Sequence, residues 1–149
     1  MNNKNIMALI MPLVLMTVLS CFGNSTGDTP PSKEEIIKAL ESIKAELTTQ
    51  RKGLVNAATK DEKKKVLESN LASTAEYKTQ LGKVKRIKKA TEATRNTCDQ
   101  EIEKYGRWEE SIRRFLKKDS PEQHDINTTV NTIGGMKKEI DKLLEFLRS

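Results

Sequence analysis

The highest concentration of charge in the sequence lies between residues 78 and 95. Seven basic side chains occur there against one acidic side chain, Glu92. The seven are Lys78, Lys83, Lys85, Arg86, Lys88, Lys89 and Arg95. On a continuous helix, spacings of seven and four residues place Lys78, Lys85 and Lys89 on one face. Such a basic strip would attract a sulfated polysaccharide, anionic lipid headgroups or an acidic protein surface. The alternative is an ordinary solvated helix face.

Residues that could support catalysis or bind a metal are scarce. His124 is the single histidine, and no second histidine or glutamate lies at metal-ligand spacing from it. Asp99, Glu101 and Glu103 are two positions apart, and side chains at that spacing diverge around a helix. The sequence contains no glycine-rich phosphate loop, nucleophile elbow or CxxC pair. We therefore expect a non-enzymatic protein without a cofactor or a bound metal.

Composition and length exclude several classes of protein. The chain has 149 residues, of which 32% are charged and 4% aromatic, and its formal net charge is +6. This length is too short for a large α/β enzyme, and two cysteines are too few for a disulfide scaffold. The single long apolar run, at the N-terminus, argues against a multi-pass membrane protein. The remaining residues can form a thin helical core.

The first twenty-one residues have the order of features found in an export signal. A polar start with Lys4 precedes an apolar run over residues 6–19, which is shorter than the roughly 20 residues of a membrane-spanning helix. The run ends in VLSC at positions 18–21, which resembles the lipobox of bacterial lipoproteins. The resemblance implies cleavage before Cys21 and a diacylglycerol thioether on its sulfur. We expect a signal peptide over residues 1–20; an uncleaved signal anchor is the alternative.

Residues 21–32 are expected to be a lipidated, flexible tether. They are mostly small and polar, contain Pro and Gly, and show no hydrophobic period. A flexible segment of this length has a root-mean-square reach of about 18 Å, so the folded part should lie close to the membrane. Phe22 stands where many enterobacterial lipoproteins of the inner membrane carry aspartate, which favours an outer-membrane location.

Cys98 is the one thiol that remains if Cys21 is acylated. It shares an apolar stripe with Ile102 and Tyr105, so we expect it to be buried and unreactive. An unpaired cysteine in an exported protein can also join two copies, and a disulfide-linked dimer through Cys98 is therefore the alternative.

Capping residues and apolar stripes predict helices after residue 32. Ser32 with Glu35, and Thr59 with Glu62, have the spacing of capping boxes. The stripe behind the first box predicts a helix over residues 33–58; its members are Ile36, Leu40, Ile43, Leu47 and Leu54. The stripe behind the second box consists of Leu67, Leu71, Thr74, Tyr77, Leu81, Val84 and Ile87. No segment alternates with a period of two, which predicts an all-α protein.

One helix over residues 60–118 would be about 88 Å long, which a small domain does not support. We place a break at Asn96-Thr97, because asparagine tolerates the left-handed conformation and Thr97 with Gln100 forms a capping pair. Gly82 is the alternative break, and an unbroken helix also stays open. These elements predict an antiparallel bundle of three to four helices over residues 33–149, with a coiled-coil rod as the alternative.

The last helix is expected to begin at Ser120, with Pro121 in its first turn. Its apolar stripe runs through Ile126, Val130, Ile133, Met136, Ile140, Leu143, Leu144 and Leu147. Gly134 and Gly135 interrupt this stripe, so we expect them to loosen or kink the helix.

The organisation of the whole chain resembles the small plasmid-encoded surface lipoproteins of Borrelia-type spirochaetes. The features shared are VLSC at positions 18–21, a short tether and helices rich in lysine and glutamate. That group includes the helical decorin-binding proteins and other small helical antigens. The resemblance implies a surface location and binding of glycosaminoglycans, matrix proteins or complement regulators through lysines on helices.

We therefore expect a non-enzymatic outer-surface lipoprotein, anchored to the outer membrane through Cys21, that acts as a surface antigen or binds a host polyanion or host protein. The basic strip over residues 78–95 is its expected ligand site. Nucleic acid is disfavoured as a partner, because an exported protein does not meet nucleic acid inside the cell and no aromatic residue interleaves with the lysines. The alternative function is a periplasm-facing structural or assembly lipoprotein whose helices bind a protein partner.

Overall fold

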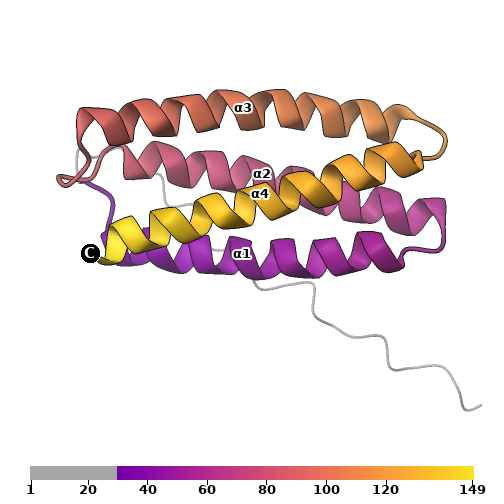
Figure 1. Ribbon diagram of the computed structural model, residues 1–149, viewed down its shortest axis with the longest axis horizontal. Coiled ribbons are helices and arrows are strands. Elements are labelled where there is room, and N and C mark those ends of the chain that lie inside the picture. The colour runs from indigo at the N-terminus through magenta and orange to yellow at the C-terminus, as the bar shows by residue number, and fades with distance from the viewer. Residues whose placement is uncertain (1–29) are drawn as a thin grey trace, which may run out of the picture.

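The computed structural model describes residues 30–149, and these form an antiparallel four-helix bundle (Figure 1). The helices are α1 (Lys33–Asn56), α2 (Lys60–Val84), α3 (Glu92–Lys117) and α4 (Gln123–Arg148). No strand occurs within the described residues, which confirms the predicted all-α bundle. The predicted signal peptide, Cys21 and nearly all of the predicted tether lie outside the described residues. We refer to residues 30–149 as the helical body.

Both α1 and α2 start where the two predicted capping boxes place them, but only the box at α2 is complete. The Ser32 hydroxyl accepts a hydrogen bond from the Glu35 backbone N–H, with an N···O distance of 3.4 Å. Thr59 Oγ1 accepts from the Glu62 N–H at 3.2 Å, and the Glu62 carboxylate accepts in return from the Thr59 N–H at 3.0 Å. Each pair satisfies N–H groups that have no partner inside the helix.

The predicted break at Asn96-Thr97 is wrong, because both residues lie inside α3. The chain turns earlier, over residues 85–91, where Ile87 and Ala90 fold inward and close one end of the core. Their exposed fractions are 7% and 6%. Thr91 then caps α3 through its hydroxyl, which accepts from the Thr94 N–H at 3.2 Å. Burial of Ile87 at the end of the bundle, rather than a glycine or an asparagine, ends α2.

The start of α4 also differs from the prediction, because the N-cap residue is Glu122 and not Ser120. The Asp125 carboxylate accepts from the Glu122 backbone N–H at 2.9 Å and from Lys118 Nζ at 2.9 Å. Asp125 thus stabilises the first turn of α4 and connects it to the end of α3. The helix continues through Gly134 and Gly135 without interruption, so the expected loosening is not observed.

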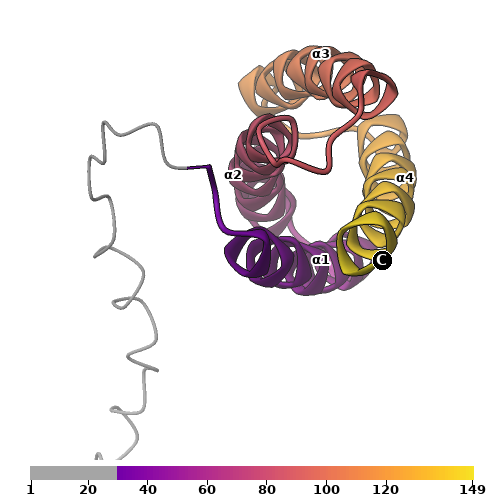
Figure 2. The same ribbon diagram turned by 90° about the vertical axis from the view of Figure 1, so that its left-hand side faces the viewer.

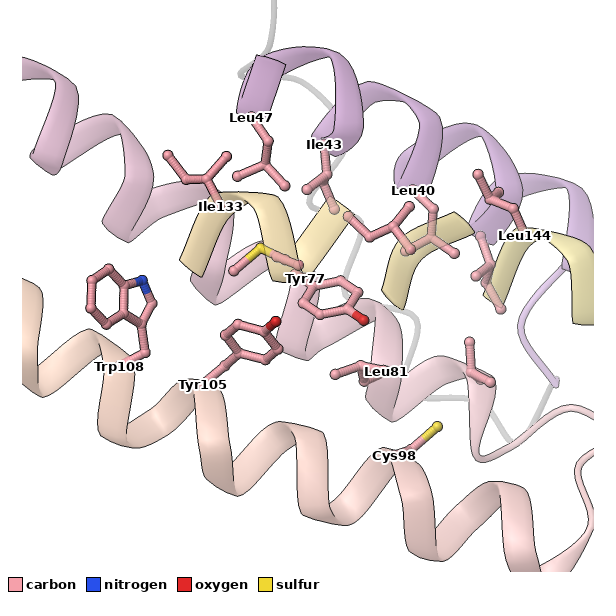
Figure 3. Close-up of a cluster of buried hydrophobic side chains, with 14 of the residues drawn as sticks. Leu40, Ile43, Leu47, Tyr77, Leu81, Cys98, Tyr105, Trp108, Ile133 and Leu144 are labelled. Carbon is pink, nitrogen blue, oxygen red and sulfur yellow. The ribbon is translucent and has the colours of Figure 1, made fainter. Parts of the chain in front are cut away.

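The predicted apolar stripes form the core. All five stripe residues of α1 are buried, and those of α2 are buried except for the half-buried Leu71. Figure 3 shows the centre of this core, where the rings of Tyr77 and Tyr105 meet edge to face at a centroid distance of 5.3 Å. Cys98 is 1% exposed, which confirms its expected burial.

A layer of polar side chains crosses the core between α1, α2 and α3. Gln50 Nε2 donates to Ser73 Oγ at 2.8 Å, and Asn70 Nδ2 donates to Gln50 Oε1 at 2.9 Å. Trp108 Nε1 donates to Asn70 Oδ1 at 3.2 Å. Because these buried groups have partners, the layer avoids the cost of unsatisfied polar atoms and favours one register of the three helices.

The four helices surround the core in the order α1, α2, α3, α4, as Figure 2 shows. Helix α1 packs along α2 and α4, and α2 packs along α3. The backbones of α3 and α4 approach each other much less, so the α3–α4 seam is the loosest of the four.

Candidate functional site

The connection between α2 and α3, residues 85–91, is the most basic segment of the helical body, and we call it the basic loop. It contains Lys85, Arg86, Lys88 and Lys89 and no acidic residue. Backbone hydrogen bonds shape it: among them, the Arg86 N–H donates to the Lys83 carbonyl at 2.9 Å, and the Ala90 N–H donates to the Ile87 carbonyl at 3.0 Å. Because Ile87 and Ala90 face the core, the charged side chains remain on the outside.

The predicted basic strip on one helix face is wrong in its geometry. Helix α2 ends at Val84, so Lys85 and Lys89 do not share a helix face with Lys78. The Lys78 side chain lies before the last turn of α2 and is half-buried. Its Nζ is 2.9 Å from Glu109 Oε1 of α3. Lys78 thus connects two helices and does not belong to the basic loop.

Three of the predicted site residues fasten the basic loop to the bundle. Lys85 forms an ion pair with Asp99, and Arg95 Nε donates to the Lys85 carbonyl at 3.2 Å. Lys89 Nζ donates to the Phe146 carbonyl at 2.9 Å and to Ser149 Oγ at 2.7 Å. These contacts tie the loop to α3 and to the C-terminal end of α4.

The remaining predicted residues leave their charge available for a ligand. Arg86 and Lys88 are exposed and Lys83 is half-buried in the last turn of α2. None of these three forms an ion pair with a carboxylate of the helical body. A polyanion that contacts Arg86 and Lys88 would therefore not have to displace an existing ion pair.

The basic loop lies at the same end of the bundle as two other chain segments. Figure 2 views this end, where the loop is beside the C-terminal end of α4 and near the first turn of α1. Arg148 in that last turn of α4 forms an ion pair with Glu41 of α1. The described chain enters α1 at this end, so a tether before residue 30 would also join here.

Sequence reasoning missed the charged cluster between α3 and α4. Glu101 of α3 faces Glu139 of α4 across the α3–α4 seam. Lys104 Nζ contacts both carboxylates, at 3.2 Å from Glu101 Oε2, and the Tyr105 hydroxyl donates to Glu139 Oε2. The only sequence signal was that Glu139 lies next to the buried Ile140, at the edge of the apolar stripe.

The helical body offers little other chemistry. Within residues 30–149, no three His, Cys, Asp or Glu side chains converge on a point where a metal ion could bind. His124 is exposed in the first turn of α4. None of the four described helices is long and apolar enough to cross a membrane.

Comparisons with known proteins returned no match to a protein-family model, to a curated protein or to a solved structure.

Proposed function

We propose that this protein is a lipid-anchored, non-enzymatic binding protein of a bacterial outer surface that binds a host polyanion through its basic loop. The observation that carries the proposal is the exposure of Arg86 and Lys88 on a loop without acidic residues. Support for the anchor comes from VLSC at positions 18–21 and the tether-like residues behind it. The resemblance in organisation to small spirochaete surface lipoproteins points to the same location and to a role as a surface antigen.

The chemistry of the basic loop suits a sulfated polysaccharide. Arginine can contact two oxygens of one sulfate group, and lysine provides a mobile point charge. Each contact releases condensed counterions from the polymer, so the affinity should fall steeply as the salt concentration rises. The contacts made by Lys85 and Lys89 hold the loop in place before the ligand arrives, which lowers the entropy that binding must offset.

The test is heparin binding by a fragment of residues 22–149, which carries the whole helical body. We expect the double variant Arg86→Gln/Lys88→Gln to lose most of the affinity and to keep its helicity, because neither side chain forms an ion pair in the helical body. The matched control is Arg51→Gln/Lys52→Gln, which removes the same charge from two exposed residues at the end of α1, at the far end of the bundle. Equal losses in both variants would mean a general charge effect and would refute a site at the basic loop.

A second candidate ligand is the anionic lipid of the membrane that carries the anchor. The observation that favours it is the position of the basic loop at the end of the bundle where the chain enters α1. A tether attached there would bring the loop close to lipid headgroups, and each lysine or arginine near an anionic surface contributes about 1 kcal/mol. Binding to phosphatidylglycerol vesicles but not to heparin would favour this candidate over the host polyanion.

The anchor and its location need their own test. We expect the wild-type chain to enter the detergent phase on phase partitioning and Cys21→Ala to remain in the aqueous phase, because two or more acyl chains give stable anchoring. Protease added to intact cells should remove the helical body if it faces the outside. Survival of the body would favour the periplasm-facing structural role.

A further inference from the structure

The loose α3–α4 seam contains a cavity of about 420 Å³. Its floor comes from Tyr77 and Leu81 of α2, and its walls come from the N-terminal half of α3 and the C-terminal half of α4. Leu143 and Phe146 contribute apolar surface to the α4 wall. The volume falls in the range of about 300–1,000 Å³ that is typical of small-molecule sites. The cavity exists because α3 and α4 do not pack closely here.

The hydroxyl of Tyr77, a residue that lines this cavity, is a buried polar group without a partner. Tyr77 is 0% exposed, and its Oη has no hydrogen-bond partner in the helical body. In Figure 3 the hydroxyl lies on the side of the ring that faces Leu81 and Cys98, which line the same cavity. Because an unsatisfied buried hydroxyl costs stability, a ligand that supplies its hydrogen bond would be favoured over an empty cavity.

Glu101 and Glu139 give the cavity an acidic side. Burial and the contact with the Glu139 carboxylate raise the pKa of the Glu101 carboxyl above its ordinary value. Burial opposes ionisation of Glu139, but hydrogen bonds from Glu101, Lys104 and Tyr105 outweigh it and lower the pKa of Glu139. Two carboxyl groups therefore share one lysine, Lys104, and a second cation beside them would offset the repulsion between them.

We propose that this cavity binds a small amphipathic organic cation, such as an alkyl or arylalkyl ammonium. Its apolar body would lie against Leu81, Leu143 and Phe146. Its ammonium N–H groups would donate hydrogen bonds to the Glu101 and Glu139 carboxylates and to Tyr77 Oη. Binding would leave each of the two carboxylates paired with a cation. The inference does not depend on the basic loop, because it concerns a different site.

The charges around the cavity favour a cation over an anion of the same shape. An anionic head would lie against the Glu139 carboxylate, and repulsion between like charges is strong where water is excluded. Lys142 also lines the cavity, but its side chain is exposed and can keep its ammonium group in water. Lys104 is already engaged by Glu101 and Glu139.

The test compares three probes of equal chain length, octylamine, octanol and octanoate, by titration calorimetry on the fragment of residues 22–149. We expect octylamine to bind about tenfold more tightly than octanol, because its head makes charged hydrogen bonds, and octanoate to bind most weakly. Equal affinities for octylamine and octanol, no binding of any probe, or preference for octanoate would each overturn the proposal.

Two variants separate the site from a general effect of charge. Glu101→Gln keeps the size of the side chain and removes its charge, so the chain should fold and its octylamine affinity should fall about tenfold to that of octanol. The control Glu103→Gln removes the same charge from an exposed residue two positions away, and it should leave octylamine binding unchanged. Equal losses in the two variants would contradict the assigned site.

Tyr77→Phe provides a readout that a purely structural role would not produce. Removal of an unpartnered hydroxyl should leave the melting temperature unchanged or raise it, while octylamine affinity falls about fivefold. Unchanged octylamine affinity in Tyr77→Phe would exclude the hydroxyl from the site and overturn the proposed arrangement.

Discussion

The charged carboxylate of Asp125 stabilises the first turn of α4. Burial raises its pKa, but the hydrogen bonds from Lys118 and from the Glu122 N–H outweigh burial and lower the pKa below its ordinary value of 3.8. A carboxyl group with a lowered pKa in the native state stabilises it above the unfolded pKa and loses that contribution as the pH falls through the native pKa.

We therefore expect Asp125→Asn to lower the free energy of unfolding by about 1–3 kcal/mol at neutral pH. The difference from wild type should shrink as the pH falls below about 4, where the wild-type carboxyl also becomes protonated. Urea unfolding at several pH values measures both effects. Asp119→Asn, at an exposed neighbour without an ion pair, should change little and serves as the control. A constant difference across the pH range would contradict this role of the charge.

Cys98 should be chemically inert in the native state. It is 1% exposed, and burial raises the pKa of its thiol, so both access and the reactive thiolate are limited. A thiol reagent should label it slowly in buffer and rapidly in denaturant. An exposed thiol introduced by Thr97→Cys together with Cys98→Ala should react rapidly in both conditions. Fast labelling of native wild type, or a dimer on non-reducing gels, would argue for the disulfide-linked alternative.

At the scale of the helices, the glycines of α4 are not required by packing. A Cβ added at Gly134 or Gly135 meets no atom within 4 Å, whereas a Cβ at Gly53 of α1 would lie 3.1 Å from Val66 Cγ2. Glycine inside a helix costs roughly 0.5–1 kcal/mol relative to alanine, mainly through the entropy of the unfolded chain.

Gly134→Ala and Gly135→Ala should therefore each raise the free energy of unfolding by about 0.5–1 kcal/mol. Gly53→Ala should gain less, because Val66 must shift to make room. Thermal unfolding of the three variants gives the comparison. A loss of stability at residue 134 or 135 would show that α4 needs the flexibility that the sequence led us to expect.

The sequence predicted the buried faces of the helices better than their ends. In α1 the stripe skips from Leu47 to Leu54, and the structure shows why: Gln50 takes the place between them and joins the polar layer. The period shows that residue 50 faces inward, but it does not identify Asn70 as its partner, since that depends on how α1 and α2 pack.

The same limit explains the partial success with the basic site. The charge of residues 78–95 can be counted in the sequence. The turn after Val84 cannot be predicted there, because Ile87 has the spacing expected of one more residue on the apolar helical stripe. Closure of the core end, a tertiary effect, moved Lys85 and Lys89 off the helix and onto the basic loop. The acidic pair of Glu101 and Glu139 joins two helices and has no local signal.

For the molecule as a whole, stability depends on burying the apolar faces of all four helices in one core. Leu40 and Ile133 are fully buried, on α1 and α4. We expect Leu40→Asp and Ile133→Asp each to destabilise the body by several kcal/mol, because each buries an unpaired charge. Circular dichroism during urea unfolding measures the loss; the control Lys38→Asp, at an exposed site, should unfold close to wild type. Wild-type stability in either core variant would contradict this packing.

The pairing of α4 with α1, the helix farthest from it in sequence, has a consequence for how the chain folds. Helices α1, α2 and α3 each pack on a neighbour in sequence, so this part can assemble rapidly through contacts of low sequence separation. Helix α4 makes few contacts with α3 and packs mainly on α1. Its docking therefore closes a loop that includes the whole helical body, which costs conformational entropy. We expect α4 to dock last and to detach first in the native ensemble, and its backbone amides to exchange with deuterium faster than those of α2. Detachment of α4 would separate the two walls of the cavity at the α3–α4 seam. A ligand bound in the cavity should therefore slow deuterium exchange of the α4 amides more than that of the other helices.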